Sequence, residues 1–151
     1  MSASKSARGR FLVVDGHSMI FSWDDLRQLH DQRMELAREA LCQRMQLYQD
    51  SVGGLRVVIV FDGNQGEAQS DRRPDDIQVL FSKKHGSADE IIERLACKYA
   101  ADHDLTVASR DRAVLDMVSS FGAHAISANG LKDMLDGAEE RFRSGNRKHF
   151  R

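Results

Sequence analysis

The sequence predicts an α/β fold of three layers, α/β/α, in which helices cover both faces of a mainly parallel central sheet of about five strands. Two apolar runs, within Arg10–Gly16 and Leu55–Gly63, each end in an Asp-Gly pair. A short continuous apolar run is typical of a strand buried on both faces. Segments with helical spacing follow these runs, and strands that alternate with helices favour a parallel sheet.

Three further strands are expected from shorter and weaker apolar stretches. They lie at Ile77–Phe81, Leu105–Ala108 and Ala123–Ile126. The stretch Gly63–Asp76 is the one long polar loop between predicted elements.

Four helices are expected around the sheet. From about Asp31 to Tyr48, apolar side chains recur every three or four residues, which predicts a helix with one buried face. Ser87 and Glu90 match a capping box, so a second helix begins there. A third helix is expected from about Arg112 to Phe121, and a short fourth from about Leu131.

The 151 residues fit one domain. We expect one folded domain at residues 10–140, between basic tails at 1–9 and 141–151. Cys42 and Cys97 lack metal-site spacing and are interpreted as buried apolar residues. No apolar run approaches the roughly 20 residues that span a bilayer, and no secretory signal is evident, so a cytoplasmic protein without a membrane partner is expected.

The net charge of −1 conceals an uneven distribution along the chain. Residues 11–140 hold 14 basic and 23 acidic side chains, a net charge of −9, whereas residues 141–151 hold five basic and no acidic ones. An acidic body with basic ends suits a metal-dependent enzyme that acts on a polyanion. The tails alone are equally consistent with merely solubilising segments.

Aspartates stand just after three predicted strands. Asp15 and Asp62 follow the first two strands, Asp111 lies shortly after the Leu105–Ala108 strand, and Asp89 falls in the first turn of the capped helix. In an open parallel sheet the ligand crevice lies at the carboxyl ends of the strands, so these four carboxylates should converge. Such oxygen ligands suit Mg²⁺ or Mn²⁺, which activate water for attack on a phosphodiester. Singly, each aspartate is also explained by a turn or a helix start.

Four ordered stretches make a more specific pattern. They are Leu12–Ile20, Val58–Asp62, Phe81–Glu93 and Val107–Asp116. Together they resemble the YacP-like group of NYN domain proteins, which belong to the PIN-like nucleases. The resemblance runs from about Arg10 to Leu135, nearly the whole chain.

The resemblance implies that Asp15, Asp62, Asp89 and Asp111 are the catalytic, metal-binding acids, with Glu90 and Asp116 as outer members. The sequence departs from the family pattern at Ser18, where asparagine is common, and at Arg110, where a small hydroxyl residue is commoner. Serine can still hydrogen-bond an aspartate or a phosphate.

Cations and aromatic residues flank the predicted site. The residues expected to bind RNA are Ser18, Lys83, Lys84, Arg110 and Arg112. For the cations, a solvated surface position is the alternative. Phe21 and Trp23 could stack a base or pack in the core, and His17 could orient substrate or be incidental.

The resemblance therefore implies a metal-dependent endoribonuclease that uses Mg²⁺ or Mn²⁺ and cleaves RNA, including mRNA in contact with the ribosome. The alternative is a non-catalytic RNA-binding or adaptor protein with a degenerate PIN-like site. A nucleotide-binding regulator is disfavoured because both glycine-rich phosphate-binding motifs are missing. The oligomeric state and the RNA sequence preference are left open.

Overall fold

The computed structural model describes residues 9–63, 76–83 and 86–149, although not the side chains of residue 142 and residues 144–149. Five parallel strands form one sheet in the order β3-β2-β1-β4-β5. The strands are β1 (Arg10–Asp15), β2 (Leu55–Phe61), β3 (Gln78–Phe81), β4 (Asp104–Ala108) and β5 (His124–Ile126). All five predicted strands are confirmed to within one residue at either end.

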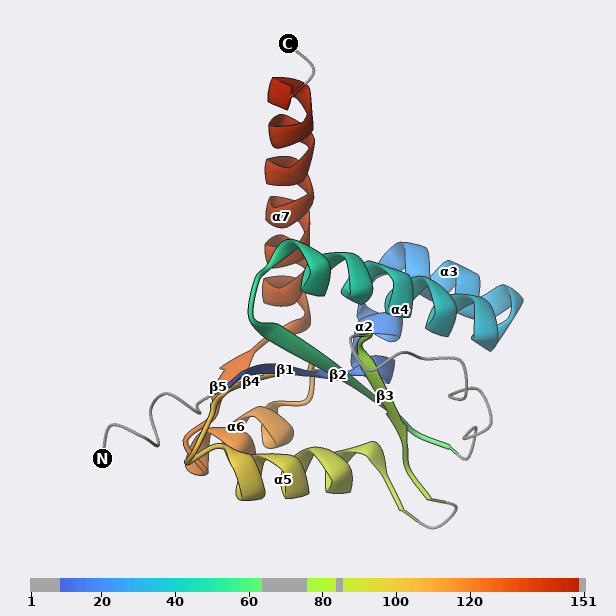
Figure 1. The fold of residues 1–151 in the computed structure, drawn as a ribbon. Helices are drawn as coiled ribbons and strands as arrows, with labels where there is room; N and C mark the ends of the chain where they lie inside the picture. Colours follow the sequence, from blue (N-terminus) through green and yellow to red (C-terminus); the bar gives the residue numbers. More distant parts are fainter. Residues whose placement is uncertain (1–8, 64–75, 84–85, 150–151) are drawn as a thin grey trace.

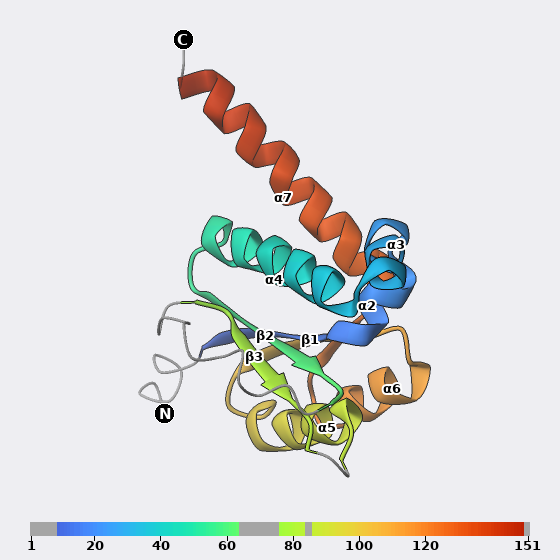
Figure 2. The ribbon, with the colours of Figure 1, turned by 90° about the vertical axis from the view of Figure 1, so that its right-hand side faces the viewer.

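Helices cover both faces of the sheet, as predicted. One face carries α2 (Gly16–Ser22), α3 (Asp24–Gln32), α4 (Met34–Ser51) and α7 (Ala128–His149), and the other carries α5 (Ala88–Tyr99) and α6 (Arg112–Ser120). Figures 1 and 2 show the two layers above and below the sheet. Side chains alternate along β1, so Leu12 and Val14 enter the core beneath α4, whereas Val13 enters the core against α5 and α6.

The order of the strands places the site. From β1 the chain passes outward to β2 and β3, then returns to β4 on the other side of β1. A crevice is expected where the order reverses, at the carboxyl ends of β1 and β4. In Figure 2 the arrowheads of β2 and β3 mark this carboxyl edge of the sheet.

Two helices before α4 were not predicted. The helix expected from about Asp31 is α4, which begins only at Met34, because Arg33 has an extended backbone (φ −156°, ψ 134°) that separates it from α3. A sequence signal existed: Met19, Ile20, Trp23 and Leu26 recur at helical spacing and are all buried.

The last helix is much longer than predicted. α7 has 22 residues and includes most of the segment expected to be a basic tail. Its first turns pack on the body through Leu131 and Leu135, and the rest projects away (Figures 1 and 2). No described helix is long and apolar enough to cross a membrane.

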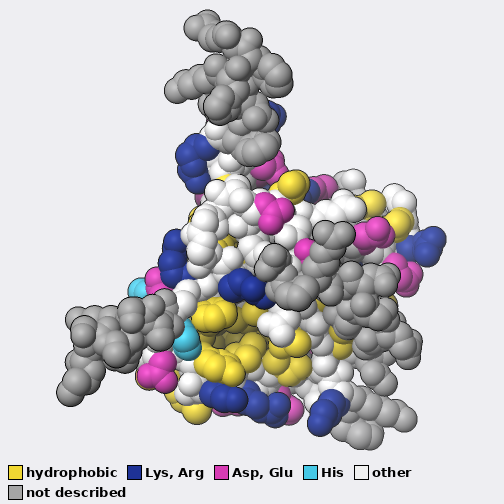
Figure 3. Space-filling view, viewed as in Figure 1, with side chains coloured by type: hydrophobic (Ala, Val, Ile, Leu, Met, Phe, Trp, Pro, Cys, Tyr) yellow, Lys and Arg dark blue, Asp and Glu magenta, His cyan; other side chains and the backbone are white. Residues whose placement is uncertain are grey.

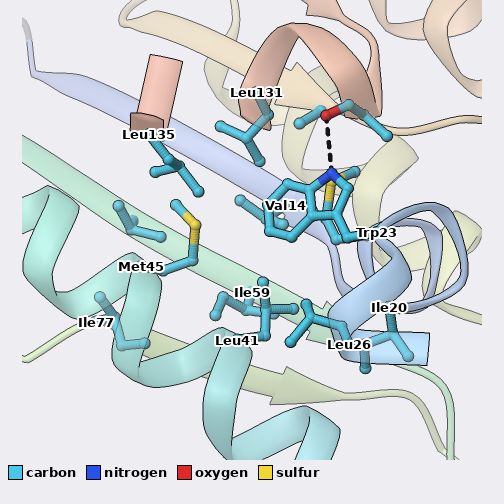
Figure 4. Packing of buried hydrophobic residues seen from close by; sticks show 14 of the residues in the cluster. Val14, Ile20, Trp23, Leu26, Leu41, Met45, Ile59, Ile77, Leu131 and Leu135 are labelled. Atoms are coloured by element: carbon cyan, nitrogen blue, oxygen red, sulfur yellow. Dashed lines mark hydrogen bonds between the residues drawn. The ribbon is translucent and has the colours of Figure 1, made fainter. Parts of the chain in front are cut away.

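Trp23 fixes the start of α7. Its side chain is 1% exposed and its Nε1–H donates to the Ala128 carbonyl at 3.1 Å (Figure 4). The suggestion that Trp23 stacks a base is therefore wrong, and the core alternative is confirmed. The burial expected for Cys97 is also wrong, because this residue is exposed and Cys42 is only partly buried.

The charged side chains do not mark out a binding surface on the face shown in Figure 3. Among the coloured residues, acidic and basic side chains are interspersed there, and hydrophobic side chains are exposed near the centre. The features that point to a function lie instead at the carboxyl edge of the sheet.

Candidate active site

Asp15 is the buried centre of the site. It ends β1 and is 6% exposed, and its Oδ2 accepts hydrogen bonds from the hydroxyls of Ser18 (2.8 Å) and Ser109 (2.9 Å). Ser109 follows β4 and also accepts a bond from the Asp111 N–H at 3.0 Å. Two hydroxyls from separate segments therefore hold this carboxylate and satisfy one of its oxygens.

Ser109 was missed by sequence reasoning, although it stands directly after a predicted strand. Ser18 was expected to bind RNA, but it is 6% exposed and its hydroxyl donates to Asp15. Ser18 thus donates a hydrogen bond to Asp15. The side-chain amide of the asparagine that is common at this position in the family could donate the same bond.

Asp62 and Asp111 lie on either side of Asp15, after β2 and β4. The Asp62 Oδ1 accepts from the N–H of Ala88 at 2.6 Å, which joins the end of β2 to the first turn of α5. The Asp111 Oδ1 accepts from the Ala113 N–H at 2.9 Å and so caps α6. Each carboxylate uses one oxygen to fix a helix start.

Asp89, in the first turn of α5, is close enough to the other three acids to sense their charge. Partial burial raises the pKa of its carboxyl, and Asp15, Asp111 and Asp62 raise it further. The Asp89 carboxyl therefore lies within electrostatic range of the three aspartates that the sequence places at the same edge of the sheet. The capping box before this helix is also confirmed, because the Glu90 N–H donates to the Ser87 hydroxyl at 3.2 Å.

The four acids do not form a closed cage for a metal ion. Within the described residues, no three acidic, histidine or cysteine side chains lie close enough to hold an ion by themselves. Mg²⁺ keeps several waters and is commonly held by one or two carboxylates together with substrate phosphates. The donor set of Asp15, Asp62, Asp89 and Asp111 fits such a partly hydrated ion.

The outer acids and the cations are more exposed. Asp116 faces Arg112 (3.8 Å, both side chains exposed), so the two largely offset each other. The Arg110 guanidinium lies over the Phe21 ring at 5.9 Å, and Phe21 is 36% exposed. Lys83 is exposed after β3, whereas Lys84 lies outside the described residues.

His17, for which the sequence left open a substrate-orienting or an incidental role, lies within the site. Its ring contacts Phe61 edge-on at 5.8 Å and stacks near Phe21 at 6.1 Å. Burial lowers the pKa of His17, nearby Arg38 lowers it further, and Asp62 and Asp15 oppose them. Its buried Nε2 has no hydrogen-bond partner among the described residues.

Arg38 was missed, because nothing in the sequence of α4 distinguishes it from the other cations of that helix. Its Nη2 donates to the Asp62 carbonyl at 3.1 Å, and its guanidinium lies over the rings of Phe61 (5.1 Å) and Phe81 (5.5 Å). Burial lowers the pKa of this guanidinium, whereas Glu35 and Asp62 raise it. Arginine nevertheless stays protonated in proteins, so a cation adjoins the acids on the β2 side.

Comparisons with known proteins agree with this architecture. The sequence model of the YacP-like NYN domain family matches residues 12–150. The YacP protein of Bacillus subtilis (strain 168) is 38% identical over 86 residues, which is 56% of this chain and 50% of that relative. The match thus spans half the length of the relative.

Two crystal structures of Rae1 (YacP) from Bacillus subtilis are similar in fold, each at 33% identity. A point mutant gives a TM-score of 0.78 over 93% of this chain and 82% of that one, and the other structure gives 0.77 over 91% and 80%. The chain therefore belongs to the YacP-like NYN domain family and has the nuclease-like fold of that family.

Proposed function

We propose that this protein is a metal-dependent endoribonuclease that cleaves RNA phosphodiester bonds, including those of mRNA in contact with the ribosome. One observation carries the proposal: four separate segments bring acids to one edge of the sheet, because Ser109 hydrogen-bonds both the Asp15 carboxylate and the Asp111 N–H, and Asp62 accepts from the N–H of Ala88, the residue before Asp89. A fold has no structural need for four carboxylates at one edge, because their mutual repulsion is unfavourable.

A Mg²⁺ or Mn²⁺ ion bound by these acids would supply activation of water and stabilisation of the charge on the leaving oxygen. Asp15 would contribute Oδ1, since its Oδ2 is already held by two serine hydroxyls. Asp62 and Asp111 would act mainly through waters that the ion keeps, because no three described side chains lie close enough to bind one ion by themselves. The Nε2 of His17, which has no hydrogen-bond partner among the described residues, would orient a phosphate or a water beside them.

The test is cleavage of a labelled RNA mixture by wild type and by Asp15→Asn, each with Mg²⁺, with Mn²⁺ and with chelator. We expect wild type to cleave with metal only, and Asp15→Asn to lose activity by about a hundredfold or more while it still folds. Asp102→Asn is the matched control, because Asp102 is an exposed aspartate just before β4, at the opposite edge of the sheet.

Wild type that binds RNA but does not cut it with either metal would contradict the proposal and favour the adaptor alternative. Equal cleavage by Asp15→Asn and wild type would refute the assignment of the site. A parallel digestion of free and ribosome-bound mRNA tests whether the ribosome is needed.

A further inference from the structure

A row of rings borders the acidic site and has an arginine at each end. Phe61, His17 and Phe21, here called the aromatic row, are in successive ring contact at 5.8 and 6.1 Å. Arg38 covers the Phe61 end at 5.1 Å and Arg110 covers the Phe21 end at 5.9 Å. The row runs from the Asp62 side of the site to the Asp111 side, because Arg38 contacts the Asp62 carbonyl and Arg110 precedes Asp111 in the chain.

Among the described residues, Arg38 uses few of its hydrogen-bond donors beside the acids. Its guanidinium carries five N–H donors. One Nη2 bond goes to the Asp62 carbonyl, while the buried Nε has no partner among the described residues. Nor does Arg38 form a salt bridge within 4.0 Å with any described carboxylate. A buried donor without a partner is unfavourable, so such a group usually indicates a missing ligand or water.

The helix that carries Arg38 is held firmly against the sheet. The Gln49 side chain of α4 accepts from the Val57 N–H in β2 at 2.8 Å, and the Gln46 side chain accepts from the Ile77 N–H at 3.0 Å. Phe61 and Phe81, stacked at 5.6 Å, support the guanidinium from below. Arg38 is therefore a preorganised cation, unlike an arginine that moves freely in solvent.

We propose that Arg38 is a phosphate-binding residue, and that it holds the RNA backbone on the Asp62 side of the site while Arg110 holds it on the Asp111 side. This inference rests on the proposed function. Four carboxylates repel a polyanion, and cations at both ends of the aromatic row would offset that repulsion and fix the path of the strand across the acids. The planar guanidinium fork matches two phosphate oxygens.

The experiment measures binding of a short single-stranded RNA by fluorescence anisotropy at several salt concentrations. All proteins carry Asp15→Asn, so that no RNA is cut. Arg38→Gln is compared with Arg56→Gln, because Arg56 is an exposed arginine near the amino end of β2, at the opposite edge of the sheet. Arg38→Lys keeps the charge over the rings and guards against a misfolded glutamine variant.

We expect Arg38→Gln to weaken RNA binding by about tenfold or more, as is typical for loss of a hydrogen bond to a charged group. Its salt slope should fall by about 0.7, which is the contribution of one phosphate contact in a single strand. Arg38→Lys should keep the slope but lose part of the affinity, because it lacks the planar fork. Arg56→Gln should bind as the parent protein does.

Equal affinities and salt slopes for Arg38→Gln and Arg56→Gln would overturn this inference. A folded Arg38→Gln protein with a lower melting temperature but unchanged RNA binding would also overturn it, since Arg38 would then only support the rings. Neither result bears on the proposed function. That proposal is refuted instead if the wild-type protein, which retains Asp15, does not cleave RNA.

Discussion

Replacement of Gly16 by alanine tests how the site is built on the sheet. Gly16 directly follows Asp15 and begins α2. A Cβ on Gly16 would lie 2.3 Å from Cε1 and 2.4 Å from Cδ1 of Phe61, well inside contact distance. The Phe61 ring is 1% exposed and stacks on Phe81, so it has little room to move away.

The expected cost follows from this overlap. Forcing one extra carbon into a well-packed core typically costs about 1–3 kcal/mol. For a domain of this size, 1 kcal/mol corresponds to roughly 2–4 °C, so a loss of about 2 kcal/mol lowers the melting temperature by on the order of 6 °C. Because Phe61 supports both Arg38 and His17, RNA cleavage should fall as well.

Thermal melting followed by circular dichroism measures the stability, and a cleavage assay on the same samples measures the activity. Gly53→Ala is the control, because a Cβ there meets nothing within 4 Å. It should leave stability unchanged or raise it by up to about 1 kcal/mol, through the unfolded state. If Gly16→Ala melts within about 1 °C of wild type, the close approach of Gly16 and Phe61 is not a constraint, and the account of the aromatic row is wrong.

Two other substitutions test particular side chains. Asp89→Asn should stabilise the protein at neutral pH. The pKa of the Asp89 carboxyl is raised in the folded state, so ionisation of this group destabilises the folded protein as the pH rises from about 3.9 through the folded pKa. Melting curves from pH 3 to pH 7 should converge at the acid end, and parallel curves would contradict the charge coupling. Trp23→Phe should cost about 2 kcal/mol, through the lost bond to Ala128 and the smaller ring, without change in RNA cleavage per folded molecule. Reduced cleavage at full stability would reinstate a role for Trp23 at the substrate.

The sheet was predictable because its signal is local. The two central strands are unbroken apolar runs, and each is buried on both faces, so their sequences need no information from elsewhere in the chain. The break at Arg33 was not predictable in this way. Arg33 has no proline or glycine beside it, and its extended backbone depends on how α3 and α4 pack together.

The same distinction applies to the site. Asp15 and Asp62 could be placed at one edge because parallel strands end together. The contact of Arg38 with Asp62 joins residues 24 positions apart, and it depends on how α4 lies across β2. The bond from Ser109 to Asp15 spans 94 positions. No spacing rule within one segment reports such contacts, so these partners required the fold.

The two serine hydroxyls that donate to Asp15 also remove its rotational freedom. Ser18 lies on the helix that follows β1, and Ser109 lies after β4, so the carboxylate plane is held from two directions. Its second oxygen therefore points in one direction before any ligand arrives. The conformational entropy of that side chain is already lost when the protein folds. A ligand that binds there therefore loses less entropy in ordering the site.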